Sequence, residues 1–202
     1  MDIADPMPPQ PGDALLVVDV QNDFLPGGAL GVSDGDAVVP VLNRWMARFE
    51  RLGLPVVLTR DWHPPDHVSF RDQGGPWPPH CVAGTPGAAF APGLVAPDSA
   101  QVVSKATTRQ AEAYSTFQGT GLAEWLRRQQ VRRVFIGGLA TDYCVLASTL
   151  DARREGFQVA VLIDAIRAVE LAPGDGARAE QAMRKAGAQV ARCTQWPAGD
   201  PA

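Results

Sequence analysis

The chain has 202 residues, 46% of them hydrophobic, and a formal net charge of −4, which fits one globular domain with one sizeable core. Its 18 Lys and Arg residues form no basic stripe, and no apolar run approaches the ~20 residues needed to cross a bilayer, so the sequence argues against nucleic acid and membranes as partners. Three scattered cysteines and an acidic, proline-rich start predict a cytoplasmic protein without a disulfide framework.

Short apolar runs of strand length alternate with helical patterns along most of the chain. In chain order we predict strand 14–20, helix 36–51, strand 55–60, strand 101–104, helix 121–130, strand 132–137, helix 143–155, strand 158–163, helix 175–186 and strand 189–192. The strands are apolar at consecutive positions, which is typical of parallel strands covered on both faces. The sequence therefore predicts an α/β domain with a six-stranded, mostly parallel, doubly wound sheet.

Three stretches fall outside this alternation. Residues 1–13 and 194–202 carry Pro and Gly and little that could pack, so we predict a flexible N-terminal extension and a C-terminal tail around a domain at 14–193. The interval 61–100 is rich in Pro and Gly and has no periodic segment, and connections of this length are usually functional or disordered. Because it also holds all three histidines, we expect an ordered, functional loop.

Reactive side chains follow several of the predicted strands. Parallel strands place their carboxyl ends at one edge of the sheet, where open α/β folds bind ligands. Asp19 ends an apolar strand, where a carboxylate is costly to bury unless it is paired or used, although it could simply cap the strand. Lys105 is one of two lysines beside sixteen arginines, which hints at a need for a compact ammonium, although a solvated lysine is the plainer interpretation.

Cys144 follows another strand, in the string GGLATDYCV. Thr141 and Asp142 can begin the next helix, so we expect the thiol in its first turn, where free N–H groups would lower its pKa. The alternative is a buried structural cysteine, the role that we assign to Cys81 and Cys193.

The histidines lie together between positions 63 and 80, and Asp61 precedes them. Asp61 and His63 point to the same side of an extended chain, and His80 could complete a facial set of three metal ligands. His67 could be a further ligand or only brace the loop. These donors suit zinc, iron or manganese, and surface histidines without a metal are the alternative. The aromatic residues Phe24, Trp77 and Tyr114 flank the same edge, so they could line a slot for a flat ring or belong to the core.

Five strings in this order resemble the nicotinamidases of the isochorismatase-like cysteine hydrolases: LLVVDVQNDFLPGGAL, TRDWHPPDHVSF, WPPHCVAGTPGAAF, AYSTFQGTGL and GGLATDYCV. The resemblance covers about residues 14–193. It implies a three-layer α/β/α sandwich, a catalytic triad of Asp19, Lys105 and Cys144, and a divalent metal, zinc first, on Asp61, His63 and His80.

The resemblance also implies a reaction, the deamidation of nicotinamide, and of pyrazinamide, through a thioester on Cys144. Asp19 would take the thiol proton, and the backbone N–H groups of Ala140 and Cys144 would hold the oxyanion, with a cis bond before Ala140. The metal would orient the ring among Phe24, Trp77 and Tyr114. The segment 106–113 and Tyr143 differ among members, which leaves pocket selectivity open.

Other functions remain as alternatives. A metallohydrolase that activates water on its metal would leave Cys144 incidental, and a ligand-binding or partner-binding module would use the same fold without catalysis. Within the family, the alternative is a sister hydrolase that acts on another small amide or on isochorismate. The sequence is compatible with a homo-oligomer but does not establish one.

Overall fold

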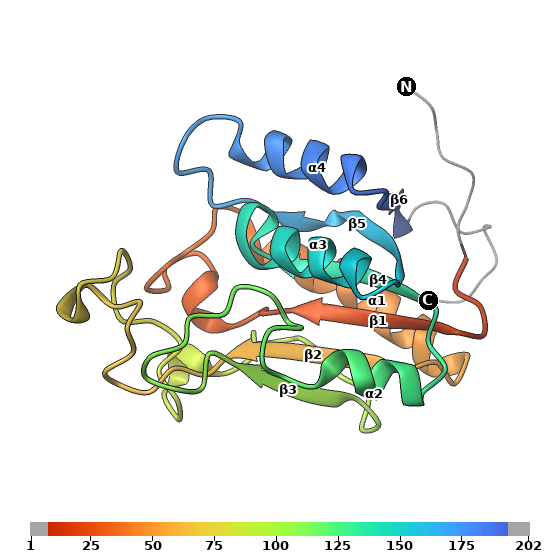
Figure 1. The fold of residues 1–202 in the computed structure, drawn as a ribbon, viewed down its shortest axis with the longest axis horizontal. Helices are drawn as coiled ribbons and strands as arrows, with labels where there is room; N and C mark the ends of the chain where they lie inside the picture. Colours follow the sequence, from red (N-terminus) through yellow and green to blue (C-terminus); the bar gives the residue numbers. More distant parts are fainter. Residues whose placement is uncertain (1–7, 194–202) are drawn as a thin grey trace.

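The computed structural model describes residues 8–193 as a six-stranded sheet with helices on both faces (Figure 1). All strands are parallel, in the order β3-β2-β1-β4-β5-β6. The strands are β1 (Asp13–Val18), β2 (Val56–Asp61), β3 (Gln101–Lys105), β4 (Arg133–Leu139), β5 (Gln158–Arg167) and β6 (Gln189–Ala191). The α-helices are α1 (Val38–Arg51), α2 (Leu122–Arg128), α3 (Leu146–Arg154) and α4 (Asp175–Lys185). The predicted α/β class is confirmed, and none of these helices is long and apolar enough to cross a bilayer.

The direction of each crossover decides which face a helix covers. From β1 the chain moves outward to β2 and β3 on one side and, after β3, to β4, β5 and β6 on the other. Right-handed connections therefore place α1 on one face and α2, α3 and α4 on the opposite face. Two hydrophobic cores result, one between α1 and the sheet and one beneath the other three helices.

The strand boundaries differ from prediction mainly at the carboxyl ends. β1 ends at Val18 instead of 20 because Asp19 takes a left-handed φ of 48°. β4 and β5 continue to Leu139 and Arg167, and their register shifts between Ile136 and Gly138. Gly138 in β4 and Asp164 in β5 hid the full length of these strands in the sequence.

The start of the described chain is held against the sheet. The carbonyl of Gly12 accepts hydrogen bonds from the backbone N–H groups of Arg132 and Arg133 at 2.7 and 3.2 Å. The guanidinium of Arg133 also forms an ion pair with Asp13, the first residue of β1. The prediction of a loose extension is therefore wrong for residues 8–13, while residues 1–7 and the predicted tail 194–202 lie outside the described residues.

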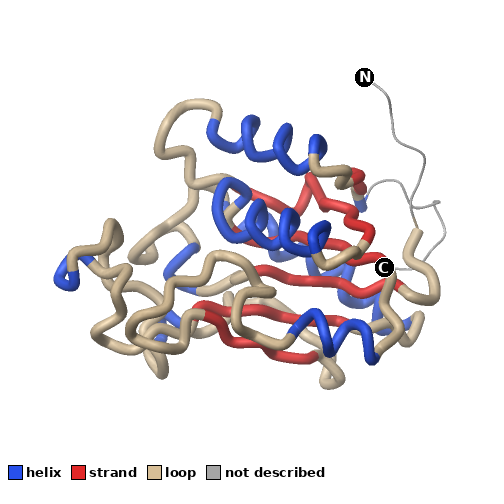
Figure 2. The backbone as a smooth tube through the Cα atoms, in the orientation of Figure 1, coloured by secondary structure: helices blue, strands red, loops and turns tan. Residues whose placement is uncertain are grey.

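The connection from β2 to β3 contains only short helical turns, Arg71–Gln73 and Pro86–Ala88, and otherwise runs as loop (Figure 2). Isolated β-bridges hold it, including one between His63 and Val82 and one between Phe70 and Trp77. This connection lies beyond the carboxyl ends of the strands, at the end of the sheet where the predicted reactive side chains meet.

Candidate active site

Lys105 lies at the centre of a buried polar cluster. Its Nζ is 3.0 Å from Oδ2 of Asp19, 2.5 Å from Oδ1 of Asp61 and 3.5 Å from Sγ of Cys144. All four residues are buried, and the sulfur lies within 4.8 Å of a carboxylate oxygen on each aspartate. The structure thus brings together the three side chains predicted as a triad, which come from three strand exits.

Hydrogen bonds from neighbouring strands fix this cluster. The left-handed φ of Asp19 turns the chain at the end of β1, and Thr59 of β2 donates from Oγ1 to Oδ1 of Asp19 at 2.7 Å. Lys105 also donates to the carbonyl of Ala113 at 3.0 Å, so its ammonium is held from the far side. The three polar ends therefore have little rotational freedom, as a preorganised site requires.

Burial and charge act in opposite directions on these groups. Burial raises the pKa of the Cys144 thiol well above its ordinary value, although Lys105 opposes this, so the expected lowering by the helix start is wrong. Burial also raises the pKa of Asp19. Burial alone would lower the pKa of Lys105, but the two carboxylates hold it well above its ordinary value. The resting cluster therefore holds a protonated thiol beside a charged lysine.

The backbone around Cys144 is not a plain helix start. Thr141–Val145 form a π-helical turn that precedes α3, whereas the sequence predicted one helix over 143–155. The Leu139–Ala140 peptide bond is cis, as the resemblance implied, and the carbonyl of Ala140 accepts from the N–H groups of Tyr143 and Val145. Ala140 and Cys144 both line the same cavity, so their backbones lie at its wall.

Asp61, His63 and His80 form a second cluster, whose potential ligand atoms all lie within 4.8 Å of one another. Nδ1 of His63 faces the carbonyl of Ala106 at 3.3 Å, and Nδ1 of His80 faces that of Pro78 at 2.8 Å. These contacts leave each Nε2 for a ligand, and Nε2 of His63 is buried without a hydrogen-bond partner among the described residues. Carbonyl-oriented imidazoles and a carboxylate fit a divalent metal.

His67 plays a different part. Its Nδ1 lies 2.7 Å from Oγ of Ser69, and its Nε2 lies 3.2 Å from the carbonyl of Ala111. The ring also packs against that of His63, with centroids 4.2 Å apart. Both ring nitrogens of His67 are thus engaged by the surrounding loops, and the group that could hold an ion is Asp61, His63 and His80.

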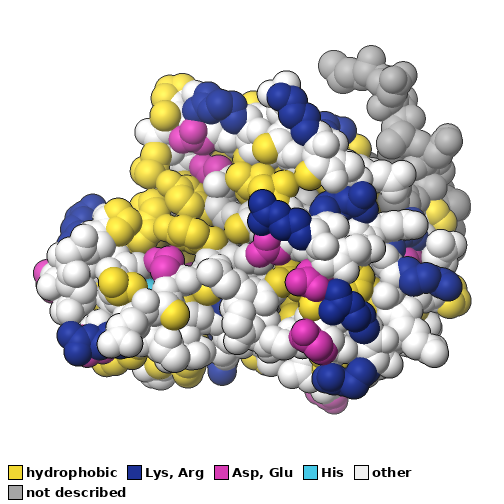
Figure 3. All heavy atoms as spheres, viewed as in Figure 1, with side chains coloured by type: hydrophobic (Ala, Val, Ile, Leu, Met, Phe, Trp, Pro, Cys, Tyr) yellow, Lys and Arg dark blue, Asp and Glu magenta, His cyan; other side chains and the backbone are white. Residues whose placement is uncertain are grey.

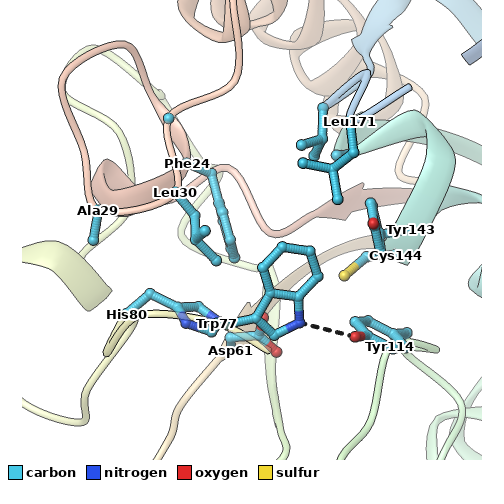
Figure 4. A pocket seen from close by; sticks show the side chains of 13 residues that line it. Phe24, Ala29, Leu30, Asp61, Trp77, His80, Tyr114, Tyr143, Cys144 and Leu171 are labelled. Atoms are coloured by element: carbon cyan, nitrogen blue, oxygen red, sulfur yellow. Dashed lines mark hydrogen bonds between the residues drawn. The ribbon is translucent and has the colours of Figure 1, made fainter. Parts of the chain in front are cut away.

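A cavity of about 360 Å³ opens beside both clusters (Figure 4). The aromatic residues predicted for a ring slot, Phe24, Trp77 and Tyr114, all line it, and Trp77 donates from Nε1 to the Tyr114 hydroxyl at 3.0 Å. Figure 3 shows hydrophobic side chains gathered at this end of the molecule. The cavity thus offers apolar walls to a small ligand and reaches Asp61, His80 and Cys144.

Sequence reasoning missed several residues of the site. Thr59 was hidden inside an apolar strand, and Gln21 was not singled out, although its amide group binds both the N–H and the carbonyl of Asp61 at 2.8 Å. The cavity is also lined by Leu30, Val169 and Leu171, which come from loops without a reactive motif. The available signal was a polar residue inside an apolar strand for Thr59 and a polar residue shortly after a strand for Gln21.

The fold and site together define an α/β/α protein with a buried thiol next to three potential metal ligands. The family model described as isochorismatase domain matches residues 13–195, and the chain belongs to the isochorismatase family. It is 38% identical to a nicotinamidase of Escherichia coli, over 94% of this chain and 98% of that protein. Such relatives are hydrolases that act on amide bonds, and this chain is one of them.

Solved structures agree with this assignment. The pyrazinamidase of Pyrococcus horikoshii, in complex with zinc, shares 48% identity and a TM-score of 0.86, covering 90% of this chain and 99% of that one. The protein PnC1 from L. infantum, in complex with nicotinate, shares 36% identity and the same TM-score, covering 94% and 98%. The likeness therefore extends over the whole of the described fold.

Proposed function

We propose that this enzyme hydrolyses nicotinamide to nicotinate and ammonia, and pyrazinamide in the same way. The observation that carries the proposal is the buried Lys105 within reach of both Asp19 and Cys144, at the wall of a small apolar cavity. The named activity of the relatives supports the amide as substrate. The three free cysteines of the chain support a cytoplasmic location.

The first step is removal of the thiol proton. Because burial keeps the Cys144 thiol protonated, a base is required, and Asp19 lies in the same cluster. The carboxylate of Asp19 takes the proton, the ammonium of Lys105 stabilises the thiolate, and the sulfur attacks the carboxamide carbon. The developing oxyanion is held by the backbone N–H groups of Ala140 and Cys144.

The second half of the reaction uses the same groups in reverse. Asp19 gives its proton to the amide nitrogen, the C–N bond breaks, ammonia leaves, and a thioester on Cys144 remains. A water molecule then gives a proton to Asp19 and adds to the thioester carbon. The C–S bond breaks, Asp19 returns this proton to the departing sulfur to restore the thiol, and the product leaves as nicotinate after its carboxyl group loses a proton to solvent. Lys105 stays protonated throughout, because two carboxylates surround it.

Asp61, His63 and His80 would hold the metal, for which we propose zinc, as in the complex of the related pyrazinamidase. When bound, the ion supplies a Lewis-acidic contact for a ring nitrogen and so helps to orient the substrate. Asp61 serves both clusters, since its Oδ1 binds Lys105 and its Oδ2 lies 3.7 Å from Nε2 of His63. Its negative charge is thereby shared between the two sites.

The named relatives favour nicotinamide over isochorismate or another small amide as the substrate. No Lys or Arg is among the described lining residues of the cavity, whereas Asp61 is, and Lys105 behind the wall is already paired with two carboxylates. This largely apolar lining suits a neutral aromatic amide, with the proposed ion near one end of the cavity. We therefore retain nicotinamide over the sister-hydrolase alternative.

The test is ammonia release from nicotinamide by the zinc-loaded wild-type protein and by Cys144→Ala. We expect kcat to fall by at least about 1,000-fold in the variant, because no thioester can form, while bound zinc is retained. Cys193→Ala is the matched control, since that cysteine lies at the end of β6, and it should keep activity. Turnover retained by Cys144→Ala would identify a metallohydrolase instead, and no release by the wild type would reject the substrate assignment.

A further inference from the structure

One wall of the cavity comes from residues 168–174, the connection from β5 to α4, which we call the β5–α4 strap. Val169 and Leu171 of this strap line the cavity, and Leu171 is nevertheless 66% exposed. Figure 4 shows its side chain directed toward the cavity above Cys144, across from His80 and Asp61. The exposed side chain of Leu171 therefore forms part of the rim of the cavity, and a bound substrate would cover this side chain.

Carboxylates hold the strap in place. Asp142, two residues before Cys144, accepts hydrogen bonds from the backbone N–H groups of Val169 and Glu170 at 2.9 and 3.0 Å. Glu170 has a left-handed φ of 55° and accepts from the N–H groups of Gly174 and Gly176, each at 2.7 Å. The strap is therefore fastened at one end to the turn that carries the thiol and at the other to the start of α4.

We propose that Leu171 determines which ring the enzyme accepts and that Asp142 is a positioning residue that holds Leu171 there, an inference that rests on the function proposed above. Trp77, Tyr114 and Tyr143 form an aromatic wall, with Tyr143 5.3 Å from Trp77 and 5.6 Å from Tyr114 between ring centroids. With Leu171 closing the cavity above Cys144, the space suits the carboxamide of a single flat ring and excludes a larger one.

The first experiment compares Leu171→Ala with wild type on nicotinamide, 5-methylnicotinamide, 6-methylnicotinamide and quinoline-3-carboxamide. We expect kcat/KM for at least one larger amide, relative to nicotinamide, to rise about tenfold or more, since a few carbon atoms in an apolar pocket carry selectivity of this size. Leu52→Ala removes an exposed leucine at the end of α1 and should leave the ratio unchanged. An unchanged ratio for every larger amide in Leu171→Ala would overturn the proposal.

The second experiment tests Asp142 through the same ratio. Asp142→Asn can accept only one of the two backbone hydrogen bonds, so we expect KM for nicotinamide to rise several-fold more than kcat falls, and the ratio to move as in Leu171→Ala. Asp151→Asn alters a carboxylate of α3 that pairs with Arg154. This control should change neither KM for nicotinamide nor the selectivity ratio. A fall in kcat alone, with selectivity kept, would contradict the positioning role. Inactivity of the wild type on nicotinamide would instead reject the proposed function itself.

Discussion

At the scale of single residues, the site depends on one cation shared by two carboxylates and a thiol. The positions of Asp19, Lys105 and Cys144 after apolar strands made them candidates in the sequence, and the family resemblance implied that they form a triad. It did not predict the protonation of the thiol, since the effect of a helix start is local, whereas the burial that raises the pKa of Cys144 comes from segments far apart in the chain. Thr59, which orients Asp19, was missed for the same reason.

Replacing Thr59 with Val tests this orientation. The Thr59 hydroxyl donates to the charged form of Asp19 and so lowers its pKa. Without that hydrogen bond the pKa of Asp19 rises further, and the acidic limb of kcat/KM should move to higher pH. We expect kcat/KM to fall by about tenfold or more, as for loss of a hydrogen bond to a charged group. Thr59→Ser should retain the wild-type pH profile of kcat/KM. If the acidic limb of Thr59→Val lies at the wild-type pH, the role of Thr59 at Asp19 is refuted.

One substitution at His80 and one at His67 test whether these two histidines differ in metal binding. Nε2 of His80 is left free by its loop, whereas both nitrogens of His67 are engaged. We therefore expect His80→Gln to lower zinc affinity by at least about 100-fold and to raise KM for nicotinamide, while His67→Gln keeps the ion. Zinc titration by calorimetry measures both. Equal losses in the two variants would show that His67 is a ligand.

At the scale of elements, the alternation of strands and helices was predictable, but their ends were not. Apolar runs and the glycines 53, 156 and 187, which all have positive φ, identified the interiors and stops of the elements. The extension of β5 to Arg167 and the strap beyond it depend on pairing with β4 and on Asp142, which are contacts between distant segments. The interval 61–100 was correctly predicted as irregular except for Asp61, which ends β2, yet its path and the contacts of His67 needed the structure.

Gly138 of β4 offers a test at this scale. It has a φ of 129°, and a Cβ there would collide with the carbonyl of Val18 in β1. Gly138→Ala should therefore lower the free energy of unfolding by at least about 2 kcal/mol, measured by chemical denaturation. Gly53→Ala has positive φ with open space around it and should cost about 1 kcal/mol. Equal losses of unfolding free energy in the two variants would mean that the close approach of β1 and β4 does not contribute to the loss in Gly138→Ala.

At the scale of the whole molecule, stability and chemistry are located in different places. The aromatic cluster of Trp45, Phe49 and Phe135 packs between α1 and the sheet, with ring centroids 5.4 to 6.3 Å apart. The reactive residues gather at the carboxyl edge, where burial of charge opposes folding. We therefore expect changes in this core to alter stability and to leave the active site unaffected.

Two neighbouring positions of α1 test that separation. Met46 faces the core and is fully buried, while Glu50, one turn later, is exposed. Met46→Ala should lower the free energy of unfolding by about 2–5 kcal/mol, and Glu50→Ala by less than about 0.5 kcal/mol. Neither should change KM for nicotinamide below the unfolding temperature. A raised KM in Met46→Ala would show that the core shapes the cavity.

The seam between β1 and β4 divides the reactive groups by their position in the chain as well as in the sheet. The acid, the amine and the ion ligands precede residue 106, whereas the thiol and the strap follow residue 138. The strap can therefore change without altering the acid, the amine or the ion ligands. One rim of the cavity is thus encoded in a different stretch of the gene from the residues that receive the thiol proton and hold the ion.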